Sequence, residues 1–167
     1  ERVLNPNVLI HKTGGGRFGN TRLKGKHWTA HVYRKEFPHR FDAYFKFMFV
    51  RNPWERELSR WMWNKRIGKG HGYDGSFKAF VTSRRGMGYA RYGGWGKTSV
   101  DFIGRFENLQ KDFNTVCDKI GIPKQKLPHS NKHDHKHYTH YYDDQTKKIV
   151  AQGYTEDIER FGYEFGN

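Results

Sequence analysis

Two short stretches of the sequence combine residue types that could bind phosphate groups. The first is IHKTGGGRFGN at residues 10–20, in which Lys12 and Arg17 flank a run of glycines. Because glycine lets the backbone approach a ligand closely and adopt positive φ, the N–H groups of such a turn can converge on an anion. Lys12 would add a mobile positive charge near a group that is being transferred. For this stretch taken alone, a flexible charged surface turn is the alternative.

The second stretch, VRNPWERELSR, follows a strongly apolar run. Arg51 would leave the end of that run, and Arg56 and Ser59 would share one face of the following helix because they are three residues apart. Arginine side chains together with a serine hydroxyl suit a second, terminal phosphate. The alternative is that both arginines are solvated or paired with the neighbouring Glu55 and Glu57.

The apolar pattern predicts the elements that would position both stretches. It favours strands at 7–10, 44–50 and 101–106, and helices at about 53–65, 76–84, 109–120 and 143–160. Strands that alternate with helices predict an α/β fold, with a mostly parallel central sheet flanked by helices in three layers. Ligands of such sheets bind at the carboxyl ends of the strands, where we expect both stretches to lie.

Local signals indicate where several helices begin and end. Asn52 is a good N-cap, and Pro53 suits the first helical position because its missing N–H would have no partner there. Gly121 is expected to end the 109–120 helix. The core is expected to be rich in aromatic residues, and Trp54, Trp61 and Trp63 are expected to lie in the core or to cover the sheet. Stacking of one of these rings on adenine or a sugar is the alternative.

Composition narrows the class of partner. The chain of 167 residues fits a single domain spanning 1–167, and its net charge of +14 favours a polyanionic partner. Charge alone leaves nucleic acid, an anionic lipid surface, an acidic polysaccharide and a phosphorylated cofactor open. The one cysteine, Cys117, excludes an intrachain disulfide and falls at apolar helical spacing, so we expect it in the core.

No apolar run in the sequence is long enough to span a bilayer. We therefore expect a cytoplasmic protein without a membrane segment. A removed N-terminal targeting or anchor segment stays open as an alternative, because the chain begins at Glu1 rather than at methionine.

Two further stretches resemble functional motifs but are expected to be ordinary loops. Gly-Lys-Thr at 96–98 lacks the first glycine of a Walker A motif, because Arg91 stands in that position. The histidine-rich stretch at 129–140 could suggest zinc, but alternating histidines in an irregular segment rarely close a tetrahedral site. We therefore expect no metal and a solvated basic loop.

Several segments together resemble the sulfotransferases that use 3′-phosphoadenosine-5′-phosphosulfate (PAPS), in particular the carbohydrate branch with heparan, chondroitin, bacterial and viral members. These segments run in order over nearly the whole chain: KTGG at 12–15, FKFMFVRNPWERELSRW at 45–61, DFIGRFENL at 101–109, LPHSNKHDHKHYTHYYDD at 127–144 and DIERFGYEF at 157–165. The resemblance implies a compact, P-loop-like sulfotransferase fold. It also implies transfer of a sulfuryl group to a hydroxyl acceptor, with 3′,5′-adenosine diphosphate as the product.

The resemblance also implies roles for particular residues. A PKTGG-type loop binds the 5′-phosphosulfate in the family, a role that falls here on Lys12, Thr13, Gly14, Gly15 and Gly16. Lys12 would contact the sulfuryl group and the bridging oxygen. An RxPxxRxxS-type block binds the 3′-phosphate in the family, a role that falls on Arg51 and Ser59.

The loop departs from the family pattern at two places. His11 stands where proline is usual, and Gly16-Arg17 replaces the usual Thr-Ser pair. Arg17 or backbone N–H groups would then take over the lost hydroxyl contacts to the 5′-phosphate. The histidine-rich stretch corresponds to a flexible basic loop that folds over the nucleotide in the family, which implies cofactor or acceptor contacts for Lys132, His133 and Lys136.

The general base is expected to be a histidine. His27 lies between the glycine loop and the central strand, where it resembles the histidine that takes the acceptor's proton in related polysaccharide enzymes. An imidazole with a pKa of about 6.5 is largely neutral, and so basic, at pH 7. His11, His31 and Glu36 are the alternatives, and a packing role beside Trp28 is the alternative function of His27.

These inferences give a leading hypothesis and two competitors. The first is in-line sulfuryl transfer from PAPS to a carbohydrate or to a small phenol or alcohol, with Lys12 in place of a metal and no obligatory nucleic acid. The second is a basic nucleic-acid-binding module with aromatic stacking. The third is a nucleotide kinase with a degenerate P-loop, against which Arg91 speaks.

Overall fold

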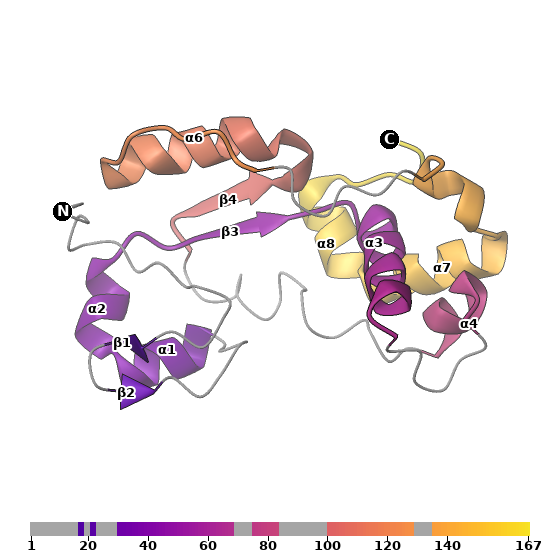
Figure 1. Ribbon diagram of the computed structural model, residues 1–167, viewed down its shortest axis with the longest axis horizontal. Coiled ribbons are helices and arrows are strands. Elements are labelled where there is room, and N and C mark those ends of the chain that lie inside the picture. The colour runs from indigo at the N-terminus through magenta and orange to yellow at the C-terminus, as the bar shows by residue number, and fades with distance from the viewer. Residues whose placement is uncertain (1–16, 19–20, 23–29, 69–74, 84–99, 129–134) are drawn as a thin grey trace. The chain divides into compact units, whose positions relative to one another are not determined.

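The computed structural model describes residues 17–18, 21–22, 30–68, 75–83, 100–128 and 135–167 (Figure 1). They form two compact units. The first unit contains β1 (Arg17–Phe18), β2 (Thr21–Arg22), α1 (Ala30–Glu36), α2 (Pro38–Ala43), β3 (Phe47–Val50), β4 (Phe102–Arg105) and α6 (Leu109–Ile120), apart from the last residues of β3 and β4. The second contains α3 (Pro53–Arg66), α4 (Phe77–Thr82), η1 (Phe106–Asn108) up to Glu107, η2 (Tyr138–Tyr141), α7 (Asp144–Gly153) and α8 (Thr155–Phe161).

In the first unit, β3 and β4 pair as neighbours that point the same way, and α6 runs alongside β4 (Figure 1). The pairing extends to Lys46, whose carbonyl accepts the backbone N–H of Asp101 at 2.8 Å, and whose own N–H donates to the Asp101 carboxylate at 2.7 Å. Gly104 of β4 is needed here, because a Cβ atom at this position would lie 2.5 Å from the Phe49 ring and 3.0 Å from the Asp112 Cβ. The parallel part of the expected sheet is therefore present, with two strands among the described residues. The predicted strand at 7–10 lies outside them.

The glycine-rich stretch is described only at Arg17 and Phe18, and the predicted phosphate-binding turn at 12–16 lies outside the described residues. Strands β1 and β2 form an antiparallel pair, with Arg17 opposite Arg22. The sequence between them, Gly19-Asn20, is typical of a two-residue β-hairpin. Helix α1 begins only at Ala30.

Helix α6 confirms its prediction from local signals. It ends at Ile120, and Gly121 follows in the left-handed conformation with φ of 70°. This conformation is costly for residues with a Cβ, so glycine is the natural C-cap. Cys117 is fully buried on the inner face of the helix, as expected.

Helix α3 contacts α4, α7 and η2, and aromatic side chains fill the space between them. Trp54 meets Phe165 edge-to-face with ring centroids 5.6 Å apart, and Phe77 meets Tyr142 in the same way at 4.8 Å. Such offset and edge-on contacts are the favoured geometries of aromatic pairs. The prediction of an aromatic core is confirmed here.

One tryptophan of α3 is more exposed than expected. Trp54 is 4% exposed, whereas Trp63 is 44% exposed. Trp54 and Trp61 are seven residues apart, two turns of helix, so they share a face. Trp63 is two residues beyond Trp61 and so projects from a different side of the helix.

The predicted helix at 143–160 is also wrong in one respect, because it is two helices. Asp143 caps α7, accepting the Thr146 N–H at 2.8 Å. The break follows Gly153, a residue that weakens helices, and falls at Tyr154, with φ of −125°. The Tyr154 hydroxyl donates to the buried carboxylate of Glu57 on α3, so a tertiary contact fixes the break.

Within the described ranges, no helix has the length and apolar character needed to cross a membrane.

Candidate functional site

The start of α3 is closed by its own side chains. The Asn52 amide oxygen accepts the backbone N–H groups of Trp54 at 3.1 Å and Glu55 at 3.4 Å, and Pro53 has no N–H to offer. Asn52 is 3% exposed. The predicted N-cap and first helical proline are therefore confirmed. As a consequence, an anion that approaches this end of α3 must be bound by side chains rather than by these amides.

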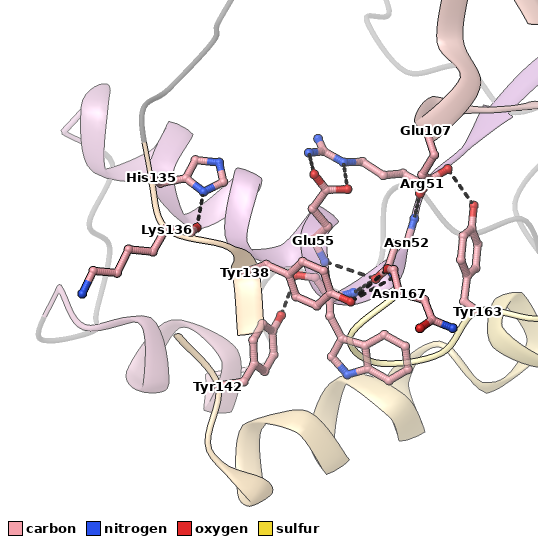
Figure 2. A network of polar contacts seen from close by, with 11 residues as sticks. Arg51, Asn52, Glu55, Glu107, His135, Lys136, Tyr138, Tyr142, Tyr163 and Asn167 are labelled. Carbon is pink, nitrogen blue, oxygen red and sulfur yellow. Dashed lines mark hydrogen bonds and ion pairs between the residues drawn. The ribbon is translucent and has the colours of Figure 1, made fainter. Parts of the chain in front are cut away.

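Arg51, the residue before this cap, holds its guanidinium against the first turn of α3 (Figure 2). Its Nη2 atom lies 2.9 Å from Glu55 Oε1, and its Nε–H donates to Glu55 Oε2 at 3.3 Å. Two of the three guanidinium nitrogens thus engage both oxygens of one carboxylate, a geometry that suits phosphate equally well. The guanidinium carbon also lies 4.1 Å from the centre of the Phe106 ring.

Ser59 follows Glu55 by four residues on the same helix, so both lie on one face of α3. Because Glu55 holds Arg51, the guanidinium lies toward the face that carries the Ser59 hydroxyl. Helix spacing puts Ser59 one turn beyond Glu55, whereas the contact that the structure gives Arg51 is with Glu55 itself. The alternative considered for Arg51, a pair with Glu55, is therefore formed.

Arg56 does not join this site. It is largely buried, and its Nη1 atom lies 3.9 Å from Asp157 Oδ2 of α8. Burial lowers the pKa of Arg56, while the nearby Asp157 and Glu57 carboxylates oppose that shift. Glu57 is itself 2% exposed and accepts two hydrogen bonds from Arg60, at 3.0 and 3.3 Å. These charges hold α3 against its neighbours. Of the two arginines expected to suit a phosphate, only Arg51 therefore remains a candidate.

A carboxylate from outside α3 supports the start of the helix. Glu107 of η1 accepts the backbone N–H of Asn52 at 2.6 Å, and the Tyr163 hydroxyl donates to its other oxygen at 3.4 Å (Figure 2). Burial, together with the charge of Glu107, raises the pKa of Tyr163. The tyrosine therefore stays a neutral donor at ordinary pH.

The Asn52 side chain is also held from the far end of the chain. Its amide donates to the backbone carbonyls of Glu164 at 3.4 Å and Asn167 at 3.3 Å. The Tyr138 hydroxyl donates to the Asn167 carbonyl at 3.2 Å and accepts the Gly166 N–H at 2.6 Å. Both the oxygen and the nitrogen of the cap amide are therefore hydrogen-bonded.

Most of the other predicted site residues lie outside the described residues: His11, Lys12, Thr13, Gly14, Gly15, Gly16, His27, Lys132 and His133. Arg17 lies in β1, where the structure describes its backbone. Of the alternative bases, His31 is on α1 and Glu36 is exposed at the end of that helix. Lys136 is exposed in the segment before η2.

Three of the histidines of the histidine-rich stretch are described. His135 contacts the Lys136 carbonyl at 2.7 Å, and His137 contacts the Thr139 hydroxyl at 2.9 Å, each through Nδ1. His140 is exposed within η2. Among the described residues, no group of three or more histidine, cysteine or acidic side chains is placed to hold a metal ion.

Phe106 and Glu107 are the site residues that the sequence analysis missed. Glu107 lies in η1, the single turn that precedes α6. The available signal was their position immediately after a short strand, where the carboxyl end of β4 directs them toward the end of β3.

Comparison with known proteins identifies the family of the chain. The family model described as the sulfotransferase family matches residues 11–86 and 96–164, which include the start of α3 and η1. An uncharacterised protein of Archaeoglobus fulgidus is 38% identical over 91 residues, covering 51% of this chain and 74% of that protein. Carbohydrate sulfotransferase 14 of Danio rerio is 25% identical, covering 95% of this chain and 56% of that protein. The chain thus spans little more than half the length of this second relative, and no solved structure matches it. The family model covers most of the sequence, and the chain belongs to the sulfotransferase family.

Proposed function

We propose that the protein transfers a sulfuryl group from PAPS to a hydroxyl group of a carbohydrate. The observation that carries the proposal is the guanidinium of Arg51 beside the capped start of α3, where two of its nitrogens engage the Glu55 carboxylate, one helical turn before Ser59. PAPS has a 3′-phosphate that ATP lacks, and Arg51 and Ser59 would bind it. Such a contact would select the donor over ATP.

The described residues fit a phosphate at this position. The Glu55 carboxylate already occupies the guanidinium with the two-point geometry that a phosphate would use. The Ser59 hydroxyl is half-buried one turn further along and can donate to the same anion. Asn52 keeps the helix capped in either state, so binding needs no change in the backbone of α3.

The chemistry of transfer is assigned to the N-terminal part of the chain. We propose that Lys12 and the backbone of Thr13, Gly14, Gly15 and Gly16 bind the 5′-phosphosulfate, with Arg17 replacing the hydroxyl contacts of the family. Lys12 would offset the charge that grows on the bridging oxygen as the sulfur–oxygen bond breaks, so that no metal is needed. The transferred group would move in line, without a covalent intermediate on the protein.

We propose His27 as the general base that takes the proton from the acceptor hydroxyl. His11, His31 and Glu36 remain the alternatives for this role. Lys132, His133 and Lys136 would contact the nucleotide or the acceptor from the histidine-rich stretch. The released nucleotide would be 3′,5′-adenosine diphosphate, and residues 1–167 would form one domain with the three-layer, P-loop-like sheet of the family.

A carbohydrate acceptor is favoured for two reasons. The net charge of +14 would attract an acidic polysaccharide, and one relative in the comparison is named a carbohydrate sulfotransferase. A small phenol or alcohol is the second candidate acceptor.

The first experiment measures the thermal unfolding of the full chain with 3′,5′-adenosine diphosphate, 5′-AMP, or ATP with magnesium. We expect only the 3′-phosphorylated nucleotide to raise the melting temperature clearly, because ligands stabilise the state that they bind. Stabilisation by ATP with magnesium instead would favour a nucleotide kinase.

The second experiment uses PAPS labelled in the sulfuryl group and a panel of polysaccharides, phenols and alcohols. We expect label in a polysaccharide, and no label when Lys12→Ala replaces the wild type. Tight, steeply salt-dependent binding of RNA or DNA, with no response to either nucleotide of the PAPS cycle, would overturn the proposal in favour of a nucleic-acid-binding module.

A further inference from the structure

The guanidinium of Arg51 has two neighbours that use different parts of it. Glu55 takes the N–H edge, with contacts of 2.9 and 3.3 Å. Phe106 lies against the flat face, with the guanidinium carbon 4.1 Å from the ring centre. An aromatic ring attracts a cation over its face without using the hydrogen-bond donors. A phosphate can therefore displace Glu55 from the edge while the contact with Phe106 persists.

The residues on both sides of Phe106 are anchored. Before it, Arg105 donates from Nη2 to the Phe161 carbonyl at 2.7 Å and lies 5.3 Å from the Tyr163 ring centre. After it, Glu107 accepts the Asn52 N–H at 2.6 Å. Phe106 itself is 42% exposed, so its ring is not fully enclosed in the core. Its backbone is thus fixed on both sides while its ring remains available to Arg51.

We propose that Phe106 is a positioning residue of the 3′-phosphate site, a platform that orients the Arg51 guanidinium for the nucleotide. This inference rests on the proposed function, because it assigns the 3′-phosphate to Arg51. A long arginine side chain loses rotamer freedom when it binds. A ring that restricts the guanidinium beforehand reduces that loss at the moment of binding.

Binding of two nucleotides to Phe106 variants of the full chain tests the inference by titration calorimetry. We expect Phe106→Ala to weaken the binding of 3′,5′-adenosine diphosphate about fivefold, which corresponds to the loss of one exposed cation–π contact. The binding of 5′-AMP should weaken less than twofold. Phe106→Trp should restore the affinity because its ring offers the best cation–π surface, whereas Phe106→Leu should not. A merely structural role would move both nucleotides or the melting temperature.

Trp63→Ala supplies a matched control. The Arg66 guanidinium lies 4.3 Å from the Trp63 ring centre, in an exposed pair of the same kind at the other end of α3. Its removal should leave both nucleotide affinities unchanged. Equal affinity of wild type and Phe106→Ala for 3′,5′-adenosine diphosphate would overturn the inference alone. If the wild type itself does not prefer this nucleotide to 5′-AMP, the proposed function fails instead.

Discussion

Helices α3 and α7 both begin with a side-chain cap and an ion pair, but the two ends differ in which group carries the negative charge. At α7 the cap itself is charged: Asp143 accepts the Thr146 N–H at 2.8 Å and pairs with Lys78 at 2.8 Å. At α3 the cap is the neutral Asn52, and the anion is Glu55.

Under the proposed function, this difference separates a structural helix end from one that binds the 3′-phosphate. The Asp143 carboxylate offsets the positive end of the α7 dipole and cannot leave without uncapping the helix. Glu55 can swing away from Arg51 while Asn52 keeps α3 capped. An external anion can therefore replace the internal one at α3, whereas α7 offers no such exchange.

Removal of the cation at each helix end should give the largest contrast. We expect Arg51→Ala to weaken binding of 3′,5′-adenosine diphosphate about thirtyfold, because charge-assisted hydrogen bonds to the phosphate are lost. Lys78→Ala removes the corresponding cation of α7, on an exposed pair, and should leave the nucleotide affinity unchanged. Calorimetric titration of both variants measures this. Equal losses would show that the two cations act only through overall charge.

Exchanging the Asn and Asp side chains at the two caps should show how differently the two caps are buried. Asn52→Asp keeps the oxygen that caps the helix. It replaces the NH2 group, which donates to the carbonyls of Glu164 and Asn167, with a buried carboxylate oxygen. We expect the free energy of unfolding to fall by about 2 kcal/mol or more. Asp143→Asn keeps an acceptor at an exposed position and should change stability much less. Urea unfolding of both variants makes the comparison, and the opposite order would contradict this reading of the caps.

The charged cap should also make α7 sensitive to acid. Hydrogen bonds from Lys78 and then Thr146 lower the pKa of Asp143 in the folded protein. The unfolded chain then binds this proton more readily, so the stabilisation is complete above the ordinary aspartate pKa of about 3.9 and is lost as pH falls through the lower folded value. The melting temperature of the wild type should exceed that of Asp143→Asn near neutral pH, and this difference should shrink below about pH 4. A constant gap would exclude titration of Asp143 as its cause.

Helix ends could be predicted from the sequence only where the signals are local. Asn52 and Pro53 identify the start of α3 within two residues, and Gly121 identifies the end of α6, because capping involves neighbours along the chain. Strand β3 was expected for similar reasons, although it begins at Phe47 rather than Tyr44.

Contacts between distant segments could not be predicted in this way. Phe106 and Glu107 are distant in sequence from Arg51 and Asn52. They meet because the strand that leads to Phe106, β4, pairs with the strand that precedes Arg51, β3. The break before α8 likewise depends on the hydroxyl of Tyr154 and the buried carboxylate of Glu57. Periodicity reports which face of an element is apolar, but it does not report which partner that face meets.

The smallest expected effect concerns the exchangeable anion itself. If Glu55 competes with the nucleotide for Arg51, Glu55→Gln should tighten binding of 3′,5′-adenosine diphosphate about threefold, since a partly exposed ion pair contributes at most about 1 kcal/mol. The same titration of Asp118→Asn, which breaks the exposed pair with Lys124 at 3.0 Å, controls for the loss of one negative charge. Weaker binding in Glu55→Gln would mean that the carboxylate holds Arg51 in place for the phosphate. The two helix ends would then differ in the charge of the cap but not in whether their anion can be exchanged.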